Sequence, residues 1–121
     1  HNGKSMNGRT ILGNKTLKLM HTNALDDYYF PIEIPSIGIV RDVNYVNDLK
    51  AYGWGFGCRT LMDLEKNNNL GSLGEFGWAG AASTYFLIDN NKDMSALLMT
   101  QVLSGSPELK NDFYKFIYTN F

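Results

Sequence analysis

The sequence has few cysteines, histidines and prolines and no excess of either charge. Its single cysteine, Cys58, excludes an internal disulfide and leaves the cellular compartment open. No run of 18 apolar residues occurs, so we expect no membrane-spanning segment. The formal net charge is −1 and no basic patch is present, which argues against a nucleic-acid partner. His1, His21 and Cys58 lack metal-site spacing, so we expect neither a metal nor a cofactor.

Apolar and aromatic residues are plentiful for a chain of this length. They make up 44% of the 121 residues and include seven Phe, seven Tyr and two Trp, enough to build the core of one domain. The first ten residues, HNGKSMNGRT, are polar and contain neither an initiator Met nor an apolar signal region. We therefore expect either a processed chain or a piece of a longer protein.

The N-terminal quarter predicts a turn and a short helix. Asn7-Gly8 favours a type I′ turn, which requires positive φ at both positions. Asn14 is the expected N-cap of an amphipathic helix over 15–23, whose apolar spacing begins with Leu17 and Met20. Residues 26–50 contain two prolines and predict an irregular excursion, whose packing partner could lie outside this chain.

The second half of the chain predicts a three-stranded antiparallel meander. Its expected strands are 52–62, 75–88 and 94–103. In the first strand, strict alternation places aromatic residues on one face and glycines on the other, and the glycine face would let another element approach closely. A polar loop, 63–73, and a turn over 89–93 connect the strands.

A C-terminal helix is expected from Ser106 onward. Ser106 is the expected N-cap, Pro107 suits the first helical position, and Glu108 places an acid in the first turn. The helix carries one apolar stripe that should pack on the sheet: Leu109, Phe113, Phe116 and Ile117. The expected fold class is therefore α+β, an antiparallel sheet flanked by N- and C-terminal helices.

Several motifs favour ordinary structural interpretations. Asp89-x-Asn91-x-Asp93 opens like an EF-hand loop, but the chain lacks the required Gly and Glu further on, so a plain turn is expected. Glu75 is expected to be solvated or to accept backbone N–H groups. The triplet Tyr118-Thr119-Asn120 is expected to belong to a helix face, and Tyr45-Val46-Asn47 falls in the irregular excursion.

The stretch GEFGWAGAA, residues 74–82, surrounds one large indole with small residues. One interpretation is a crowded strand, in which small residues let another backbone or a helix approach. The other is a strand edge left bare so that a ligand can reach backbone amides, with Trp78 as one wall. The chain contains neither Ser-x-x-Lys nor Gly-x-Ser-x-Gly, so its spacing indicates no activated nucleophile.

The order of these segments resembles a known family. YGWGFG, GEFGWAGAASTYFLID, ALLMTQ and the helix that begins SPELKNDFYKFIY follow one another as in the C-terminal third of β-lactamase-like serine hydrolases, a group that includes class C β-lactamases, carboxylesterases and penicillin-binding-protein relatives. The family uses a Ser-x-x-Lys nucleophile, a Tyr-x-Asn or Ser-x-Asn box and a Lys-Thr-Gly box. Trp78-Ala79-Gly80 resembles the variant of the last box in esterase-like members.

The resemblance implies a role for four neighbouring residues. Trp78, Ala79 and Gly80 would border the substrate cleft, and Ala81 would offer its backbone N–H as one oxyanion-hole donor. The second donor would be the N–H of the nucleophile, which this chain lacks. Lys is absent at position 78, which weakens any expectation of efficient β-lactam turnover, and the catalytic Tyr is not assigned to Tyr45.

These observations support two hypotheses of different classes. In the first, residues 1–121 are a single C-terminal fragment of a β-lactamase-like domain, inert alone, whose full-length protein hydrolyses an ester, amide or β-lactam through an acyl-enzyme. Its partner would be the missing N-terminal part. In the second, the chain is a stand-alone, non-catalytic binding or assembly domain of the same fold. Either allows a homo-oligomer formed through an exposed sheet edge.

Overall fold

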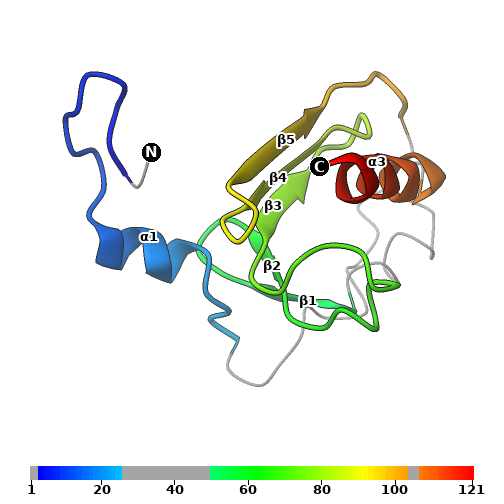
Figure 1. Ribbon diagram of the computed structural model, residues 1–121, viewed down its shortest axis with the longest axis horizontal. Coiled ribbons are helices and arrows are strands. Elements are labelled where there is room, and N and C mark those ends of the chain that lie inside the picture. The colour runs from blue at the N-terminus through cyan, green and yellow to red at the C-terminus, as the bar shows by residue number, and fades with distance from the viewer. Residues whose placement is uncertain (1–2, 26–49, 104–106) are drawn as a thin grey trace.

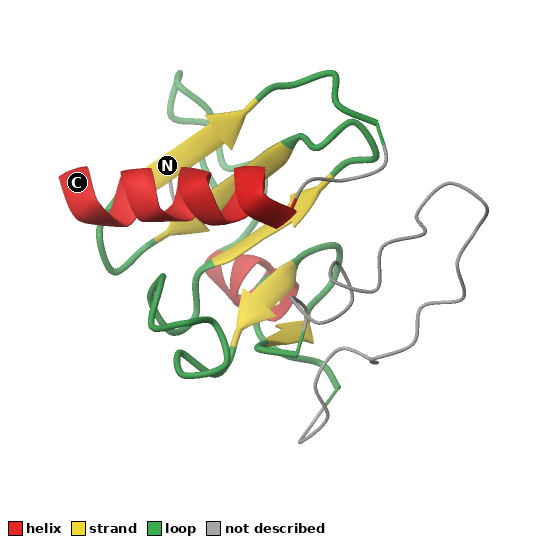
Figure 2. Ribbon diagram, turned by 90° about the vertical axis from the view of Figure 1, so that its right-hand side faces the viewer, coloured by secondary structure: helices red, strands yellow, loops and turns green. Residues whose placement is uncertain are grey.

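The computed structural model describes residues 3–25, 50–103 and 107–121. These residues form an α+β fold with one five-stranded antiparallel sheet in the order β1-β2-β3-β4-β5. The sheet separates two helices: in Figure 2, α3 crosses in front of the strands and α1 lies behind them. The bounds of the elements are α1 Asn14–Met20, β1 Tyr52–Trp54, β2 Arg59–Leu61, β3 Phe76–Ala79, β4 Tyr85–Asp89, β5 Met94–Leu98 and α3 Pro107–Asn120.

The sheet has five strands where about three were expected, because two of the expected strands are hairpins. The first reverses after Trp54, where the Gly55 amide donates to the Cys58 carbonyl and Gly57 has a φ of +100°. The second reverses between β3 and β4, and the third ends at Leu98 instead of residue 103. The alternating pattern continues through the turn, so it does not reveal that the chain reverses there. Phe56 lies in this turn and is exposed, although the pattern predicted a strand position for it.

The expected close approach to the first glycines is nevertheless present. A Cβ on Gly53 would lie 2.4 Å from the Asn23 side chain, and one on Gly55 would lie 2.2 Å from the Met20 carbonyl oxygen. The Ala24 amide also donates to the Trp54 carbonyl at 2.8 Å. The segment that follows α1 therefore packs against β1 and occupies part of its outer edge.

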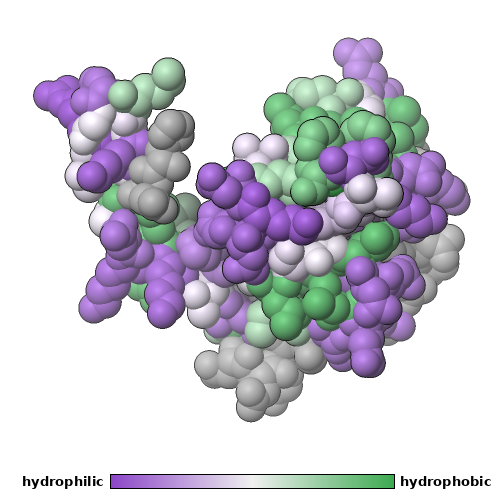
Figure 3. All heavy atoms as spheres, in the orientation of Figure 1, coloured by the Kyte–Doolittle hydropathy of each residue, from purple (hydrophilic) through white to green (hydrophobic). Residues whose placement is uncertain are grey.

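The N-terminal quarter forms a small hairpin followed by a helix. Lys4 and Thr10 form an isolated antiparallel bridge, so the hairpin is present. Gly8 has a φ of +81° but Asn7 does not have a positive φ, so the turn is not type I′. The helix begins at Asn14 itself, with Gly13 as N-cap, and ends at Met20 instead of residue 23. In Figure 3 the outer surface of this N-terminal part is mainly hydrophilic.

Helix α3 covers one face of the sheet and completes the larger core (Figure 1). Leu87 of β4 packs there with Tyr114 and Ile117 of α3, and partly buried residues surround them. Leu109 and Phe113 are half-buried as expected, but Phe116 is 61% exposed and lies against Phe121. A smaller cluster under β1 and β2 contains Ala51, Tyr52 and Leu61.

Three further predictions concern connecting segments. The excursion at 26–50 lies outside the described residues except for Lys50, as does the expected N-cap Ser106. The turn over 89–93 is confirmed: one carboxylate oxygen of Asp89 accepts the amides of Asn91 and Lys92 at 2.9 and 3.2 Å. None of the helices within residues 3–25, 50–103 and 107–121 has the length and apolar character that a membrane crossing requires.

Candidate functional site

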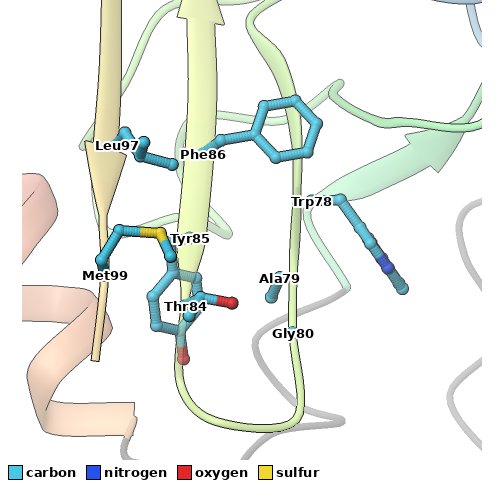
Figure 4. Close-up of a pocket in the computed structure, with 8 residues that line it drawn as sticks. All are labelled: Trp78, Ala79, Gly80, Thr84, Tyr85, Phe86, Leu97 and Met99. Carbon is cyan, nitrogen blue, oxygen red and sulfur yellow. The ribbon is translucent and has the colours of Figure 1, made fainter. Parts of the chain in front are cut away.

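Trp78, Ala79 and Gly80 lie at the end of β3, on the side of the sheet that α3 leaves open. The register pairs Trp78 with Phe86, and Phe86 with Leu97, so one row of large side chains crosses three strands on one face. Together with Met99 they surround a shallow cavity of about 210 Å³ (Figure 4). Leu97 and Met99 are 66% and 70% exposed, so the row is an apolar surface without a covering layer among the described residues.

The small residues around Trp78 have identifiable packing roles. A Cβ on Gly77 would lie 2.0 Å from the Phe86 carbonyl oxygen, and one on Gly80 would lie 2.4 Å from the Thr84 hydroxyl oxygen. Close approach of the β4 backbone therefore accounts for Gly77, as the crowded-strand interpretation expected, and the Thr84 side chain in the turn lies where a side chain on residue 80 would begin. These contacts do not explain why residues 79 and 81 are alanines. The interpretation that the strand edge is bare so that a ligand can reach backbone amides therefore still applies at Ala79 and Ala81.

Ala81 lies in the turn between β3 and β4 and is exposed. The turn is closed by the Ser83 amide, which donates to the Gly80 carbonyl at 3.1 Å. Within the described part of the chain, the Ala81 amide has no hydrogen-bond acceptor. An amide without an acceptor among the described residues can donate to an external carbonyl oxygen, which is what an oxyanion-hole donor requires.

Hydrogen bonds from the segment after β5 hold this turn in place. The Thr100 hydroxyl donates to the Ala82 carbonyl at 2.5 Å, and the Val102 amide donates to the same carbonyl at 3.2 Å. The Ser83 hydroxyl donates to the Val102 carbonyl at 2.8 Å, and Ser83 has a φ of +57°. The segment after β5 therefore restrains the part of the turn that directly follows Ala81.

The cavity beside Trp78 is lined mainly by apolar side chains. None of its eight lining residues is Asp, Glu, His, Lys, Arg or Cys, and its side-chain hydroxyl groups are those of Thr84 and Tyr85. Trp78 itself can only donate a hydrogen bond through its indole N–H. The indole packs edge-on against Trp54, with ring centres 4.5 Å apart, so it is positioned as a rigid wall. The lining therefore offers an apolar binding surface without charged side chains, next to the turn that contains Ala81.

A second group of candidate residues lies beneath α3. This buried polar cluster consists of Arg59, Glu75, Asp89, Lys110, Tyr114 and Tyr118. Its four charged side chains are at most 3% exposed. Arg59 donates to the Tyr114 hydroxyl at 3.0 Å, and the Tyr118 hydroxyl lies between the carboxyl groups of Glu75 and Asp89, 3.0 Å from the latter. Perturbed ionisable groups of this kind are common at functional sites.

The expectation of a solvated or N–H-bonded Glu75 is wrong, because its carboxyl group is buried against Tyr118. Burial raises the pKa of Glu75, and the hydrogen bond from Tyr118 acts in the opposite direction. The pKa of Tyr118 is itself raised, first by burial and then by its bond to Glu75. The four charged side chains of the cluster are too deeply buried for a substrate to reach, so we assign the cluster a structural role.

The sequence contained one signal for this cluster. Lys110, Tyr114 and Tyr118 are spaced by four residues and therefore lie on one face of α3. Their partners on the sheet could not be identified, because Arg59, Glu75 and Asp89 come from three separate strands or strand ends. The triplet Tyr118-Thr119-Asn120 belongs to a helix face, as expected. Tyr45-Val46-Asn47 lies outside the described residues.

Comparisons with known proteins do not assign the chain to a family or the site to a function. No protein-family model matches the chain, and no curated protein matches it. Within residues 3–25, 50–103 and 107–121, no group of three or more His, Cys, Asp or Glu side chains could hold a metal ion. The functional interpretation therefore depends on the sequence resemblance together with the open face around Trp78.

Proposed function

We propose that the chain is the C-terminal part of a β-lactamase-like serine hydrolase and provides one wall of its active-site cleft. The observation that carries the proposal is the exposed Ala81 amide, held in a restrained turn directly after Trp78-Ala79-Gly80. In the proposed reaction, this amide donates to the oxyanion that forms when a serine attacks an ester or amide carbonyl. Such a donor contributes about 3–4 kcal/mol of transition-state stabilisation.

The apolar row beside the amide suits the acyl portion of a substrate. Trp78 and Phe86 offer a broad aromatic surface next to the turn, and no charged side chain lines the cavity. An uncharged ester or amide fits this surface better than a substrate whose recognition needs a cation. The nucleophile and the general base belong, in this proposal, to the missing N-terminal part, so the 121-residue chain alone is inert.

The test begins with the coding region directly upstream of His1. A reading frame that continues into Ser-x-x-Lys and a Tyr-x-Asn or Ser-x-Asn box supports the proposal. The longer protein should then be labelled by a fluorophosphonate and should hydrolyse p-nitrophenyl acetate, whereas the 121-residue chain should remain unlabelled. An upstream frame without these boxes, or labelling of the chain alone, contradicts the proposal.

Substitution of Ala81 by Pro removes the proposed donor in the longer protein. We expect a loss of about 100- to 1,000-fold in kcat. Ala81→Gly is the matched control, because it changes the same residue and keeps the backbone amide. Circular dichroism spectra of both variants separate a lost donor from a disturbed turn. Equal activity of Ala81→Pro and the unaltered protein would contradict the assigned role.

A non-catalytic assembly domain is the second candidate, and the edge of the sheet favours it. β5 pairs with β4 on one side, and no described strand pairs with its other side. An unprotected edge strand beside an apolar face invites addition of another strand. This candidate requires no nucleophile upstream, so the upstream sequence separates it from the hydrolase.

A further inference from the structure

A second cavity, unrelated to Trp78, lies between α1 and the sheet. Its volume is about 560 Å³, within the range of small-molecule sites. Leu17 and Met20 line it from α1, and Phe76 and Ile88 line it from adjacent positions on β3 and β4. The cavity is partly open to solvent and combines apolar side chains with polar ones, which suits a ligand that has both kinds of group.

One wall of this cavity is formed by two stacked aromatic rings, those of His21 and Phe76. The His21 ring stacks on Phe76 with ring centres 4.5 Å apart and an angle of 13° between the planes. The Thr60 hydroxyl donates to the His21 carbonyl at 3.0 Å, which ties the end of α1 to β2. These two contacts hold the residue that follows α1 against β2 and β3 at one end of the cavity.

The lining of the cavity carries a positive charge and no negative one, which favours an anionic ligand. Lys18 is in the lining, and none of the ten lining residues is Asp or Glu. Within the described residues, Lys18 forms no ion pair. The Asn90 side chain, also in the lining, adds an amide donor. The Cys58 thiol lines the cavity too, but burial raises its pKa, so it is a neutral group and not a competing anion.

We propose that this cavity binds a small amphiphilic carboxylate, such as a medium-chain fatty-acid anion. The apolar chain lies between the α1 side chains Leu17 and Met20 and the sheet side chains Phe76 and Ile88. The carboxylate lies at the mouth, beside Lys18. This ligand differs from the proposed ester or amide substrate in charge and in location, so either proposal can fail without the other.

The test uses the full 121-residue chain labelled with ¹⁵N and titrated with sodium octanoate. We expect saturable shifts of the amide signals of Leu17, Met20, Phe76 and Ile88. Lys18→Gln should weaken octanoate binding by about fivefold, the size expected for a partly exposed ion pair, and leave 1-octanol binding unchanged. Lys15→Gln is the matched control, because Lys15 is on the same helix but does not line the cavity.

Three results would overturn the proposal. The first is that octanoate causes no saturable shifts of the amide signals. The second is that the shifts are confined to the face around Trp78 and Phe86. The third is that Lys18→Gln and Lys15→Gln weaken octanoate binding equally. Equal affinities for octanoate and 1-octanol in the unaltered chain would overturn the assigned charge preference. Retained dispersion in the spectra of both variants shows that the comparison concerns folded protein.

Discussion

At the scale of single residues, the hydroxyl of Tyr118 connects the C-terminal end of α3 to two strands of the sheet. It lies within hydrogen-bond reach of Glu75 and Asp89, yet a phenol has only one proton to donate. The hydroxyl therefore donates to one of the two carboxyl groups at a time, while both stay beside it. This position links the C-terminal part of α3 to the residue before β3 and to the last residue of β4.

Removal of this hydroxyl should weaken the fold. Tyr118→Phe leaves two buried carboxyl groups without their shared partner, and we expect a loss of about 2–3 kcal/mol in the free energy of unfolding. Urea denaturation followed by circular dichroism measures it. Thr119→Val, an exposed hydroxyl removal on the same helix turn, is the control and should change stability by less than about 0.5 kcal/mol. Equal effects of the two substitutions would refute the role of Tyr118.

The raised pKa of Glu75 also predicts the direction of a pH effect. In the folded protein Glu75 binds its proton more tightly than in the unfolded chain, so its contribution to stability is complete at low pH and is lost as pH rises through the folded pKa. The contribution changes by at most about 1.4 kcal/mol per pH unit for one proton.

Glu75→Gln tests this effect by removing the titrating group. The free energy of unfolding should decline less steeply with rising pH in Glu75→Gln than in the unaltered chain, as denaturation at a series of pH values from 4 upward would show. Glu65→Gln, a substitution of an exposed acid, should preserve the original slope. A slope for Glu75→Gln that matches the unaltered chain would show that Glu75 titrates normally.

At the scale of elements, α3 packs through a face that differs from its most apolar one. Ile117 is 5% exposed and contacts the core with Tyr114, whereas Phe116 is 61% exposed. The helix therefore buries Tyr114 and Lys110 and half-buries Tyr118, while it leaves Phe116 exposed. The charged ends of the strands explain this choice, because Glu75 and Asp89 need polar partners from the element that covers them.

Two alanine substitutions separate the buried face from the exposed one. Ile117→Ala should lower the free energy of unfolding by about 2–4 kcal/mol, because it opens a cavity between α3 and β4. Phe116→Ala, the larger truncation on the same helix, should cost less than about 1 kcal/mol. Thermal or urea denaturation measures both, and the reverse order would mean that the helix is rotated about its axis.

At the scale of the whole molecule, the two edges of the sheet differ: other described residues contact the edge at β1, and no described strand pairs with the edge at β5. Residues that follow α1 engage the outer edge of β1, while the outer edge of β5 has no partner strand among the described residues. Exposed Leu97 and Met99 lie on and just after this strand. An open edge beside exposed apolar side chains favours association with another chain.

We therefore expect the isolated chain to self-associate through β5. Leu97→Lys should shift it toward monomer, because a charge on the edge strand opposes pairing. Sedimentation velocity at several concentrations measures the change. Leu73→Lys is the control, since Leu73 is also exposed but lies in the loop before β3. A chain that is monomeric before any substitution would contradict the expectation.

The sequence by itself determined the α+β class, the antiparallel pairing, the two helices and the turn at 89–93, because local periodicity, caps and turn residues specify these features. It also identified Trp78-Ala79-Gly80 as a distinctive stretch. It could not show that two of the expected strands are hairpins, since residues such as Phe56 continue the alternation through the turn.

Only the tertiary structure decided which side chains meet across the sheet. The row of Trp78, Phe86 and Leu97 depends on the register of three strands, and the burial of Glu75 and Asp89 depends on where α3 crosses them. Contacts between residues far apart in the chain depend on how the elements pack, and local sequence patterns carry no record of that packing. The open face and the restrained Ala81 amide are consequences of it.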